Sequence, residues 1–518
     1  MAAFPETSLA TLHIDEPRLG FGYGQMSDHP KDGLFLYGPQ TKAARAEITV
    51  GVIGTEDGIG YFKRWAKTLV RGIKIPPRGP RDKHVRLHLS NFPGFAEAYG
   101  IKLDPERLVS YTLDLDEIEA MTAIANHHEA VAKTVEMFLG PIEAHMKNEE
   151  RGVDVWVFVV PEKVFERCRP QMGKKRKVVL TPGEHVKSQA KRSDMPLLAG
   201  IVDTSDEAIF DDVPDFHRQI KARLLSLGAP SQLIRETTLA PDAFLNKAGK
   251  PIRGTQDSAT VAWNLATGLY YKTQANPPWR LADMRPGVCY VGLIFKIIPN
   301  HADNHACCAA QMFLSEGDGV VFRGANGPWL TERKEFHLSK AGAKALIETV
   351  LETYRTRFDE YPKELFIHGT TKFNDEEWEA FEEVAPEGTN IVGVRIKPSH
   401  GEMKIYRNGD YPTLRGTAVL LGDSDAYLWT SGYAPRIDTY LGPETPNPLF
   451  VTILRATNGK PDLELVLTDI MGLTKINYNA CNYSDSEPVT IRFAKKVGDV
   501  LVMGSAKDAE RQPFKFYI

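Results

Sequence analysis

The chain has 518 residues, of which 42% are apolar and 25% charged, and its formal net charge at pH 7 is −4. This length and composition predict a folded protein with two large domains and exclude a largely disordered chain. The acidic balance argues against a strongly basic nucleic-acid-binding protein, although a binding cleft can still be basic locally.

The first half of the chain predicts strands alternating with helices. Residues 1–40 are rich in glycine and turn signals and predict an irregular arm or linker. Apolar runs rich in β-branched residues predict buried strands at Ile48–Gly54 and Val153–Val160. Helical periodicity is found at Ile59–Val70, Leu115–Lys147, Phe216–Leu227 and Ser258–Lys272. Apolar strands between helices are typical of a parallel, Rossmann-like sheet, so residues 41–275 are predicted to form an α/β domain.

After the turn at Asn276–Trp279 the pattern changes to long strands in succession. The predicted elements are strands at Val288–Ile298, Ala306–Leu314 and Gly319–Arg323, a helix at Lys340–Phe358, a strand at Glu364–His368, a helix at Asp375–Val384 and a strand at Asn390–Lys397. A meander of three strands followed by helix, strand, helix and strand is the order of an RNase H-like domain, which we predict for residues 276–518.

One group of polar residues suggests a phosphate site. His217 and Lys221 lie four residues apart on a predicted helix and therefore share a face, while Gln232 and Lys272 follow a turn and the end of the next helix. Lysine supplies compact positive charge, and glutamine and histidine add hydrogen-bond donors. Taken alone, this spacing is also common on ordinary solvated helix faces.

The wider sequence around these residues resembles the MID signature of Argonaute proteins, in the segments Phe216–Leu225, Pro230–Gln232, Trp263–Leu265, Tyr270–Lys272 and Pro278–Trp279. The resemblance implies that His217, Lys221, Gln232 and Lys272 bind the 5′-phosphate of a guide strand. His217 stands where many relatives have tyrosine. The chain ends in Phe514–Ile518, and in prokaryotic Argonautes the terminal carboxylate helps to coordinate a divalent cation. The resemblance assigns that role to Ile518, with Mg²⁺ as the cation.

The resemblance extends over nearly the whole chain. Ala306–Phe313, Gly416–Thr417, Pro446–Leu449 and Leu473–Asn479 are similar to PIWI segments, and this similarity makes Lys475 and Asn477 candidate contacts for the guide backbone. Because little sequence precedes the MID-like part, the chain resembles short prokaryotic Argonautes, which lack N and PAZ domains. The similarity is greatest to those paired with a TIR–APAZ protein.

Metal-dependent cleavage is not expected, because the sequence lacks the acids that hold two metals in RNase H-like nucleases. Where active relatives carry aspartate, the first strand has Ile294 and the fourth strand leads to Thr370. A nuclease that uses a displaced acidic set, drawn from Glu316, Asp318 and Asp469, is the alternative in another functional class. A scaffold that binds APAZ but no guide is a third possibility.

Two further segments carry clusters of charged or metal-ligating residues. The basic stretch at 173–192, including Lys174–Lys177, is interpreted as a surface loop that is either solvated or in contact with nucleic acid. His301, Asp303 and His305 precede two cysteines, but their spacing matches no common zinc pattern.

The resemblance therefore implies an inactive, guide-RNA-directed recognition subunit that pairs its guide with single-stranded target DNA from a plasmid or phage. The implied partner is an APAZ-containing effector in a heterodimer that can oligomerise on target binding. A TIR NADase is favoured, and a SIR2 NADase or a nuclease remains an alternative. Target recognition would then deplete NAD and cause abortive infection. No run approaches eighteen apolar residues and no signal-peptide pattern opens the chain, so we expect a cytoplasmic protein without membrane contact.

Overall fold

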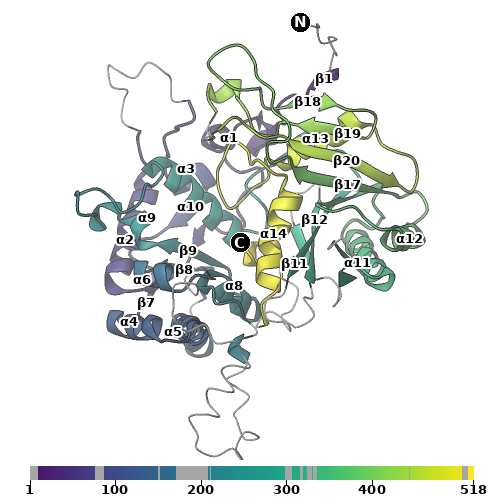
Figure 1. The fold of residues 1–518 in the computed structure, drawn as a ribbon. Helices are drawn as coiled ribbons and strands as arrows, with labels where there is room; N and C mark the ends of the chain where they lie inside the picture. Colours follow the sequence, from purple (N-terminus) through teal and green to yellow (C-terminus); the bar gives the residue numbers. More distant parts are fainter. Residues whose placement is uncertain are drawn as a thin grey trace, which may run out of the picture.

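The computed structural model contains two α/β lobes that meet along the helices α8 and α14 (Figure 1). It describes residues 10–75, 87–149, 152–170, 208–210, 212–297, 306–314, 319–323, 329–330, 335–440, 442, 444–504 and 512–518. No helix in these ranges has the length and apolar character that crossing a membrane requires.

The first lobe is built on a sheet of four parallel strands in the order β7-β5-β8-β9. These strands are β5 (Val50–Gly54), β7 (Val109–Thr112), β8 (Val155–Val160) and β9 (Ser231–Arg235). Every residue of β8 is buried, which explains its continuous apolar sequence, because helices cover both faces of the sheet. The prediction of a parallel, Rossmann-like sheet is confirmed.

The helices of this lobe are α2 (Glu56–Arg71), α4 (Leu115–Ala123), α5 (His127–Asn148), α6 (Glu162–Arg167), α8 (Phe216–Leu227) and α10 (Ser258–Thr273). Helices α2 and α10 pack on one face of the sheet, and α5 and α8 pack on the other. The single helical segment predicted from residue 115 to residue 147 is two helices, because Asn126 caps a new helix with its side chain.

The second lobe contains a nine-stranded sheet in the order β1-β18-β19-β20-β17-β16-β11-β12-β13. Strands β11 (Val288–Ile297), β12 (Ala306–Leu314) and β13 (Gly319–Arg323) form an antiparallel meander, and β16 (Glu364–Gly369) and β17 (Asn390–Pro398) continue parallel to β11. This is the predicted RNase H-like order, and it is confirmed. Strands β18 (Thr417–Leu420), β19 (Asp425–Leu428) and β20 (Leu449–Ala456) extend the sheet and were not predicted.

Helices cover both faces of this second sheet. Helices α11 (Lys340–Phe358) and α12 (Asp375–Val384) pack on one face through residues such as Ile347 and Phe381. Helices α13 (Leu463–Leu473) and α14 (Val489–Leu501) pack on the face that turns toward the first lobe. The minor elements are α3 (Phe95–Tyr99), α9 (Glu236–Leu239), β4 (Glu47–Ile48), β6 (Lys102–Leu103), β14 (Trp329–Leu330), β15 (Phe336–His337), η5 (Ala208–Phe210), η6 (Pro241–Ala243) and η7 (Pro435–Ile437).

The N-terminal segment is ordered by its contacts with the second lobe. Strand β1 (Ala10–His13) pairs with β18, and β2 (Leu19–Gly20) lies between β3 (Met26–Ser27) and β10 (Arg280–Leu281). The short helices η1 (Gly22–Gly24) and α1 (Pro30–Tyr37) complete this segment. Residues that were expected to form an irregular arm therefore form regular structure, because strand partners more than 200 residues away supply their hydrogen bonds.

The C-terminal segment lies where the two lobes meet (Figure 1). Its 3₁₀ helix η9 (Phe514–Phe516) inserts Phe514 against Tyr271 of α10 and Phe493 of α14, at ring-centroid distances of 6.4 and 4.5 Å. Ile518 is only 5% exposed. The aromatic sequence of this segment thus fills an apolar gap between the lobes.

Helix α14 approaches the sheet very closely at one glycine. A Cβ atom placed on Gly292 in the centre of β11 would lie 1.8 Å from the carbonyl oxygen of Thr490. Any side chain at this position would push α14 away from β11, and with it the contacts that α14 makes with α8.

We expect Gly292→Ala to lower the unfolding free energy by about 1–3 kcal/mol, because overpacking forces backbone to move. Thermal unfolding followed by circular dichroism measures the change. Gly140→Ala is the matched control, since nothing lies near a Cβ at this exposed position in α5 and alanine favours helix. Equal unfolding temperatures for Gly292→Ala and wild type would contradict the close approach.

Candidate functional site

Two helices and one strand of the first lobe bring the predicted residues together. Asp215 caps the N-terminus of α8, because its side chain accepts a hydrogen bond from the backbone N–H of Arg218. The helix itself buries Phe216, Ile220 and Leu224 in the core. This packing leaves Lys221 facing β9 and the end of α10. Lys221, Gln232 and Lys272 therefore meet at one place, as predicted.

The two lysine side chains are buried and hydrogen-bonded. The Nζ of Lys221 donates to the carbonyl oxygen of Ser231 at 2.7 Å and to the main-chain oxygen of Ile518 at 2.6 Å. The Nζ of Lys272 donates to Gln232 Oε1 at 2.7 Å and to Asn479 Oδ1 at 3.2 Å. Each lysine is only 1% exposed. Three of these four acceptors are oxygens of neutral amide groups, so the positive charges have little direct compensation.

The electrostatics of the pocket reflect this excess of positive charge. Desolvation and the nearby Lys496 lower the pKa of Lys272 to about 7. Desolvation, followed by Lys272 and Lys496, lowers the pKa of Lys221 well below its usual value. An anion entering the pocket would favour the charged form of both lysines, since opposite charges within a few ångströms stabilise each other.

His217 lies at the mouth of the pocket and part of its side chain is exposed. Desolvation by the surrounding protein, followed by the charges of Lys221 and Lys496, lowers its pKa to about 3. The imidazole is therefore neutral near pH 7 and presents one donor and one acceptor. It can hydrogen-bond or stack on a ligand but adds no permanent charge.

A cavity of about 580 Å³ adjoins His217. Its wall includes Phe165, whose ring is contacted by the guanidinium groups of Arg169 and Arg235, at 4.1 and 3.4 Å from the ring centroid. Planar cationic and aromatic groups of this kind are suited to a flat, electron-rich ring such as a nucleobase.

Three residues of the pocket were missed in the sequence. Asn479 and Lys496 come from the second lobe, and Gly268 lies one turn before Lys272, where a Cβ would be 3.2 Å from Gln232 Oε1. A glycine in the middle of an amphipathic helix is a recognisable signal. Asn479 and Lys496 carry no local signal, because only the docking of the lobes places them at the pocket.

Lys475 and Asn477 do not line an open surface, and the predicted contact with a guide backbone is not supported for either. The side chain of Lys475 is fully buried, and its Nζ donates to Glu16 Oε1 at 2.6 Å and lies 3.9 Å from the ring centroid of Tyr483. Asn477 donates to Asp485 Oδ2 at 2.8 Å. The two residues instead hold the loop 475–486 in place.

The expected metal ligand Ile518 lies at the pocket, but a magnesium ion there would have to share its oxygen ligands with lysine ammonium groups. Mg²⁺ prefers oxygen ligands in octahedral geometry. The oxygens of Ile518, Gln232 and Asn479 each already accept a hydrogen bond from a lysine ammonium group. Within the described ranges no group of three or more His, Cys, Asp or Glu residues is arranged to hold a metal ion.

The two positions at which the resemblance leads one to expect nuclease acids are adjacent in the sheet. Ile294 of β11 follows Leu293, which pairs with Gly369 immediately before Thr370, so the two positions lie side by side where β16 ends. Ile294 is buried and apolar. Asp469 of the alternative acidic set is ion-paired with Arg285 at 2.8 Å, and Glu316 and Asp318 lie outside the described residues. The basic stretch at 173–192 and the group His301, Asp303 and His305 also lie outside them.

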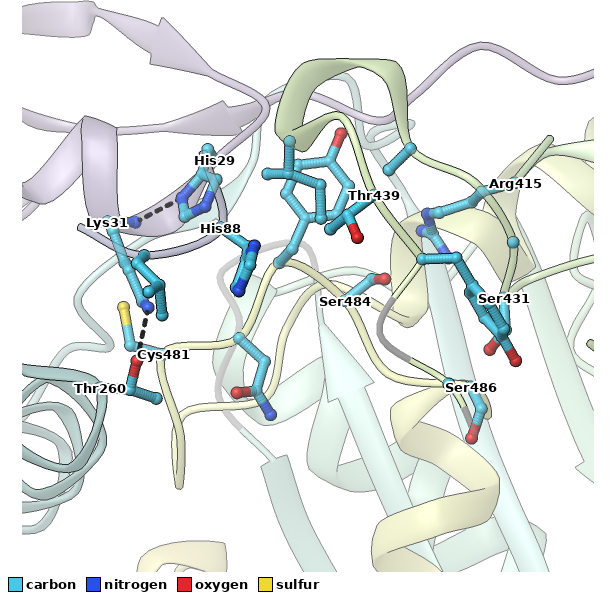
Figure 2. A pocket seen from close by; sticks show the side chains of 18 of the residues that line it. His29, Lys31, His88, Thr260, Arg415, Ser431, Thr439, Cys481, Ser484 and Ser486 are labelled. Atoms are coloured by element: carbon cyan, nitrogen blue, oxygen red, sulfur yellow. Dashed lines mark hydrogen bonds between the residues drawn. The ribbon is translucent and has the colours of Figure 1, made fainter. Parts of the chain in front are cut away.

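A larger cavity of about 650 Å³ lies at the other end of α10, between the N-terminal segment and both lobes (Figure 2). Its polar lining includes Lys31, Thr260, Arg415, Asn482, Ser484 and Ser486. Lys31 is 5% exposed, and its Nζ is 3.5 Å from Thr260 Oγ1, as Figure 2 shows. Hydroxyl, amide and ammonium donors from separate segments therefore converge on this cavity.

Comparison with solved structures identifies the fold. The Clostridium butyricum Argonaute bound to a guide DNA and a 19-mer target DNA is similar with a TM-score of 0.59 and 18% identity, over 96% of this chain and 53% of that chain. Aa-Ago with externally bound siRNA is similar with a TM-score of 0.55 and 15% identity, over 98% of this chain and 56% of that chain. The A. aeolicus Argonaute is similar with a TM-score of 0.53 and 14% identity, over 97% of this chain and 54% of that chain. No protein-family model matches the chain, and no curated protein sequence matches it.

The fold is therefore that of the MID and PIWI domains of Argonaute proteins, with an RNase H-like PIWI lobe. The chain spans just over half the length of the solved Argonautes that it matches. Identities this low establish the fold alone, because one fold can carry different functions.

The pH dependence of stability should report the desolvated Lys272. Its pKa is about 7 in the folded protein and ordinarily 10.5, so between these values the unfolded chain binds more protons. Above pH 10.5 the amine is neutral in both the folded and the unfolded chain, so its burial costs no charge desolvation. As the pH falls from 10.5 toward 7, the unfolded chain gains a proton that the folded protein does not bind, and the unfolding free energy decreases. We expect the unfolding free energy of wild type, relative to Lys272→Met, to rise between pH 7 and 10 by on the order of 1 kcal/mol or more.

Thermal and denaturant unfolding at several pH values measure this difference. Lys247→Met, at an exposed position, serves as the control and should show no such trend. If the difference in unfolding free energy between wild type and Lys272→Met stayed constant from pH 7 to 10, Lys272 would keep an ordinary pKa in the folded protein.

Proposed function

We propose that this chain is a nuclease-inactive, guide-directed recognition protein of the short prokaryotic Argonaute type. It binds the 5′-phosphate of a guide RNA and pairs that guide with single-stranded target DNA. Base pairing reads the target sequence, while the protein holds the guide by its phosphate end and backbone.

The observation that carries this proposal is the pair of buried lysines that face mainly neutral oxygens. Lys221 and Lys272 project from two helices to one point, with Gln232 and Asn479 beside them. A terminal phosphate has strong acceptor oxygens and close to two negative charges near pH 7. It would replace the weak acceptors, compensate both lysines and remove the cause of their lowered pKa values.

The arrangement of cavities supports a path for the rest of the strand. The first base fits the cavity beside Phe165 and His217, where stacking surfaces are available. The backbone would then pass to the far end of α10, where Thr260 lies twelve residues or about 18 Å along the helix from Lys272. There it reaches the cavity that contains Lys31.

A recogniser of this type needs a separate effector. Ile294 and Thr370 supply no metal-binding oxygen of the kind that RNase H-like cleavage requires, which supports an inactive PIWI lobe. We propose that the effector is an APAZ-containing partner in a cytoplasmic heterodimer, with a TIR NADase favoured over a SIR2 NADase or a nuclease. Target recognition, with or without oligomerisation, would then deplete NAD in a cell invaded by a plasmid or phage and cause abortive infection.

The test of the phosphate pocket is binding of a labelled guide RNA that carries either a 5′-phosphate or a 5′-hydroxyl. We expect the phosphorylated RNA to bind at least about tenfold more tightly, because each charge-assisted hydrogen bond contributes appreciably. The double variant Lys221→Gln/Lys272→Gln should bind both RNAs alike. Lys31→Gln, in the distant cavity, should weaken both RNAs by the same factor.

Arg223→Gln is the matched control, because Arg223 lies on α8 but points to Glu136 of α5, at 3.8 Å. It should keep the wild-type preference. Weak and equal binding of the two RNAs by wild-type protein would reject the pocket and favour a scaffold that binds no guide.

The test of the effector proposal is reconstitution with the TIR–APAZ protein. We expect the chain with guide RNA to leave a complementary DNA intact in Mg²⁺ or Mn²⁺, and the complex to consume NAD only when guide and target are both present. The DNA should stay intact because Ile294 and Thr370 stand where nuclease acids are expected. NAD consumption should require both strands because the guide is held in the phosphate pocket and must pair with its target. Target cleavage by the isolated chain, abolished by Asp469→Asn, would instead support the autonomous nuclease.

A further inference from the structure

We propose that Lys496 of α14 is the third lysine of the phosphate pocket, and that the three lysines hold the guide 5′-phosphate without a divalent cation. This inference rests on the proposed function, because it concerns the same pocket. It assigns to a PIWI-lobe side chain the charge that the resemblance assigned to Mg²⁺ at Ile518.

The position of Lys496 on its helix follows from the ion pairs on either side of it. Asp499, three residues later, lies 3.5 Å from Arg218 of α8. Arg492, four residues earlier, pairs with Asp485 of the loop 475–486 at 2.8 Å. Residues three and four apart share a helix face, so Lys496 lies on the face of α14 that is turned toward α8 and this loop. Both of these elements border the pocket.

Lys496 has no hydrogen-bond or ion-pair partner among the residues that the structure describes. Its side chain is exposed, and its Nζ lies 5.7 Å from the centroid of the Phe493 ring. The neighbouring Lys495 differs, because its Nζ pairs with Glu487 at 2.5 Å. Only Lys496 of these two lysines is available for a ligand.

The charges around the pocket support the same assignment. Lys496 is the charged group that most lowers the pKa of Lys272, and it also acts on Lys221 and His217. Its own pKa is lowered by desolvation and by Arg492, which Asp485 partly offsets. A phosphate dianion bound at this point would face three ammonium groups, and together with the Ile518 carboxylate it would balance their charge before any metal is added.

The position that a bridging cation would need is already taken by an ammonium group. The Nζ of Lys221 lies 2.6 Å from Ile518 O, one of the two oxygens of the terminal carboxylate that was expected to bind Mg²⁺. An ion bound there would approach this buried lysine closely, and like charges repel strongly where water is excluded. A lysine-only pocket avoids that repulsion.

The experiment measures binding of an unstructured guide RNA with a 5′-phosphate or a 5′-hydroxyl, in MgCl₂ and in EDTA at matched ionic strength. Matching matters because salt alone weakens nucleic-acid binding. We expect wild type to show the same preference for the 5′-phosphate in both buffers. Lys496→Gln should lose about tenfold in affinity for the phosphorylated RNA and keep its affinity for the hydroxyl RNA. Lys495→Gln should match wild type.

The outcomes separate this inference from the proposed function. A wild-type preference that disappears in EDTA overturns the metal-free pocket but leaves guide binding intact. Equal behaviour of Lys496→Gln and Lys495→Gln overturns the role of Lys496. Absence of any 5′-phosphate preference in MgCl₂ rejects the proposed function itself. Unchanged circular dichroism and unfolding temperatures of both variants, at surface positions, exclude a folding defect.

Discussion

Burying two lysine ammonium groups where the lobes meet requires polar atoms from both lobes, and much of the structure follows from this constraint. A desolvated charge is costly unless hydrogen bonds compensate it. The first lobe supplies Ser231 and Gln232, whereas the second lobe supplies Asn479 and Ile518. The lobes must therefore keep one relative orientation, and the packing of Phe514 between them maintains it. The remaining excess of positive charge would favour an anion in this pocket.

A second buried ionic cluster connects the N-terminal segment to the same region. Glu16 accepts hydrogen bonds from Arg415 and Lys475, and although burial alone would raise its pKa, these two cations lower it. Removing one partner from such a cluster leaves a buried charge unpaired, which is strongly destabilising. Lys475 begins the loop that carries Asn479 to Lys272. The N-terminal segment thus helps to hold one wall of the pocket.

Elements that depend on residues close together in sequence were predicted correctly, whereas contacts between residues far apart in sequence were not. Helices α8 and α10 and strands β11 and β16 were predicted within about one residue, because helical spacing and continuous apolar runs are patterns that short stretches of sequence show directly. The N-terminal segment was expected to be irregular, because strand pairing with β18 leaves no short-range pattern. Lys475 was placed on the guide backbone by family position alone, whereas its burial follows from Glu16, which lies 459 residues away in sequence.

The sequence by itself determined the two α/β lobes, the shared helix face of His217 and Lys221, and the apolar residue at position 294, since these depend on residue type and short spacing. Only the tertiary structure decided which lysines are desolvated and which remain free. Lys221 meets Ile518 across 297 residues, Asn479 reaches Lys272 across 207, and Lys496 is brought to the pocket by ion pairs on α14. Desolvation and charge compensation depend on all atoms within a few ångströms, and the chain brings those atoms together only when both lobes have folded and docked.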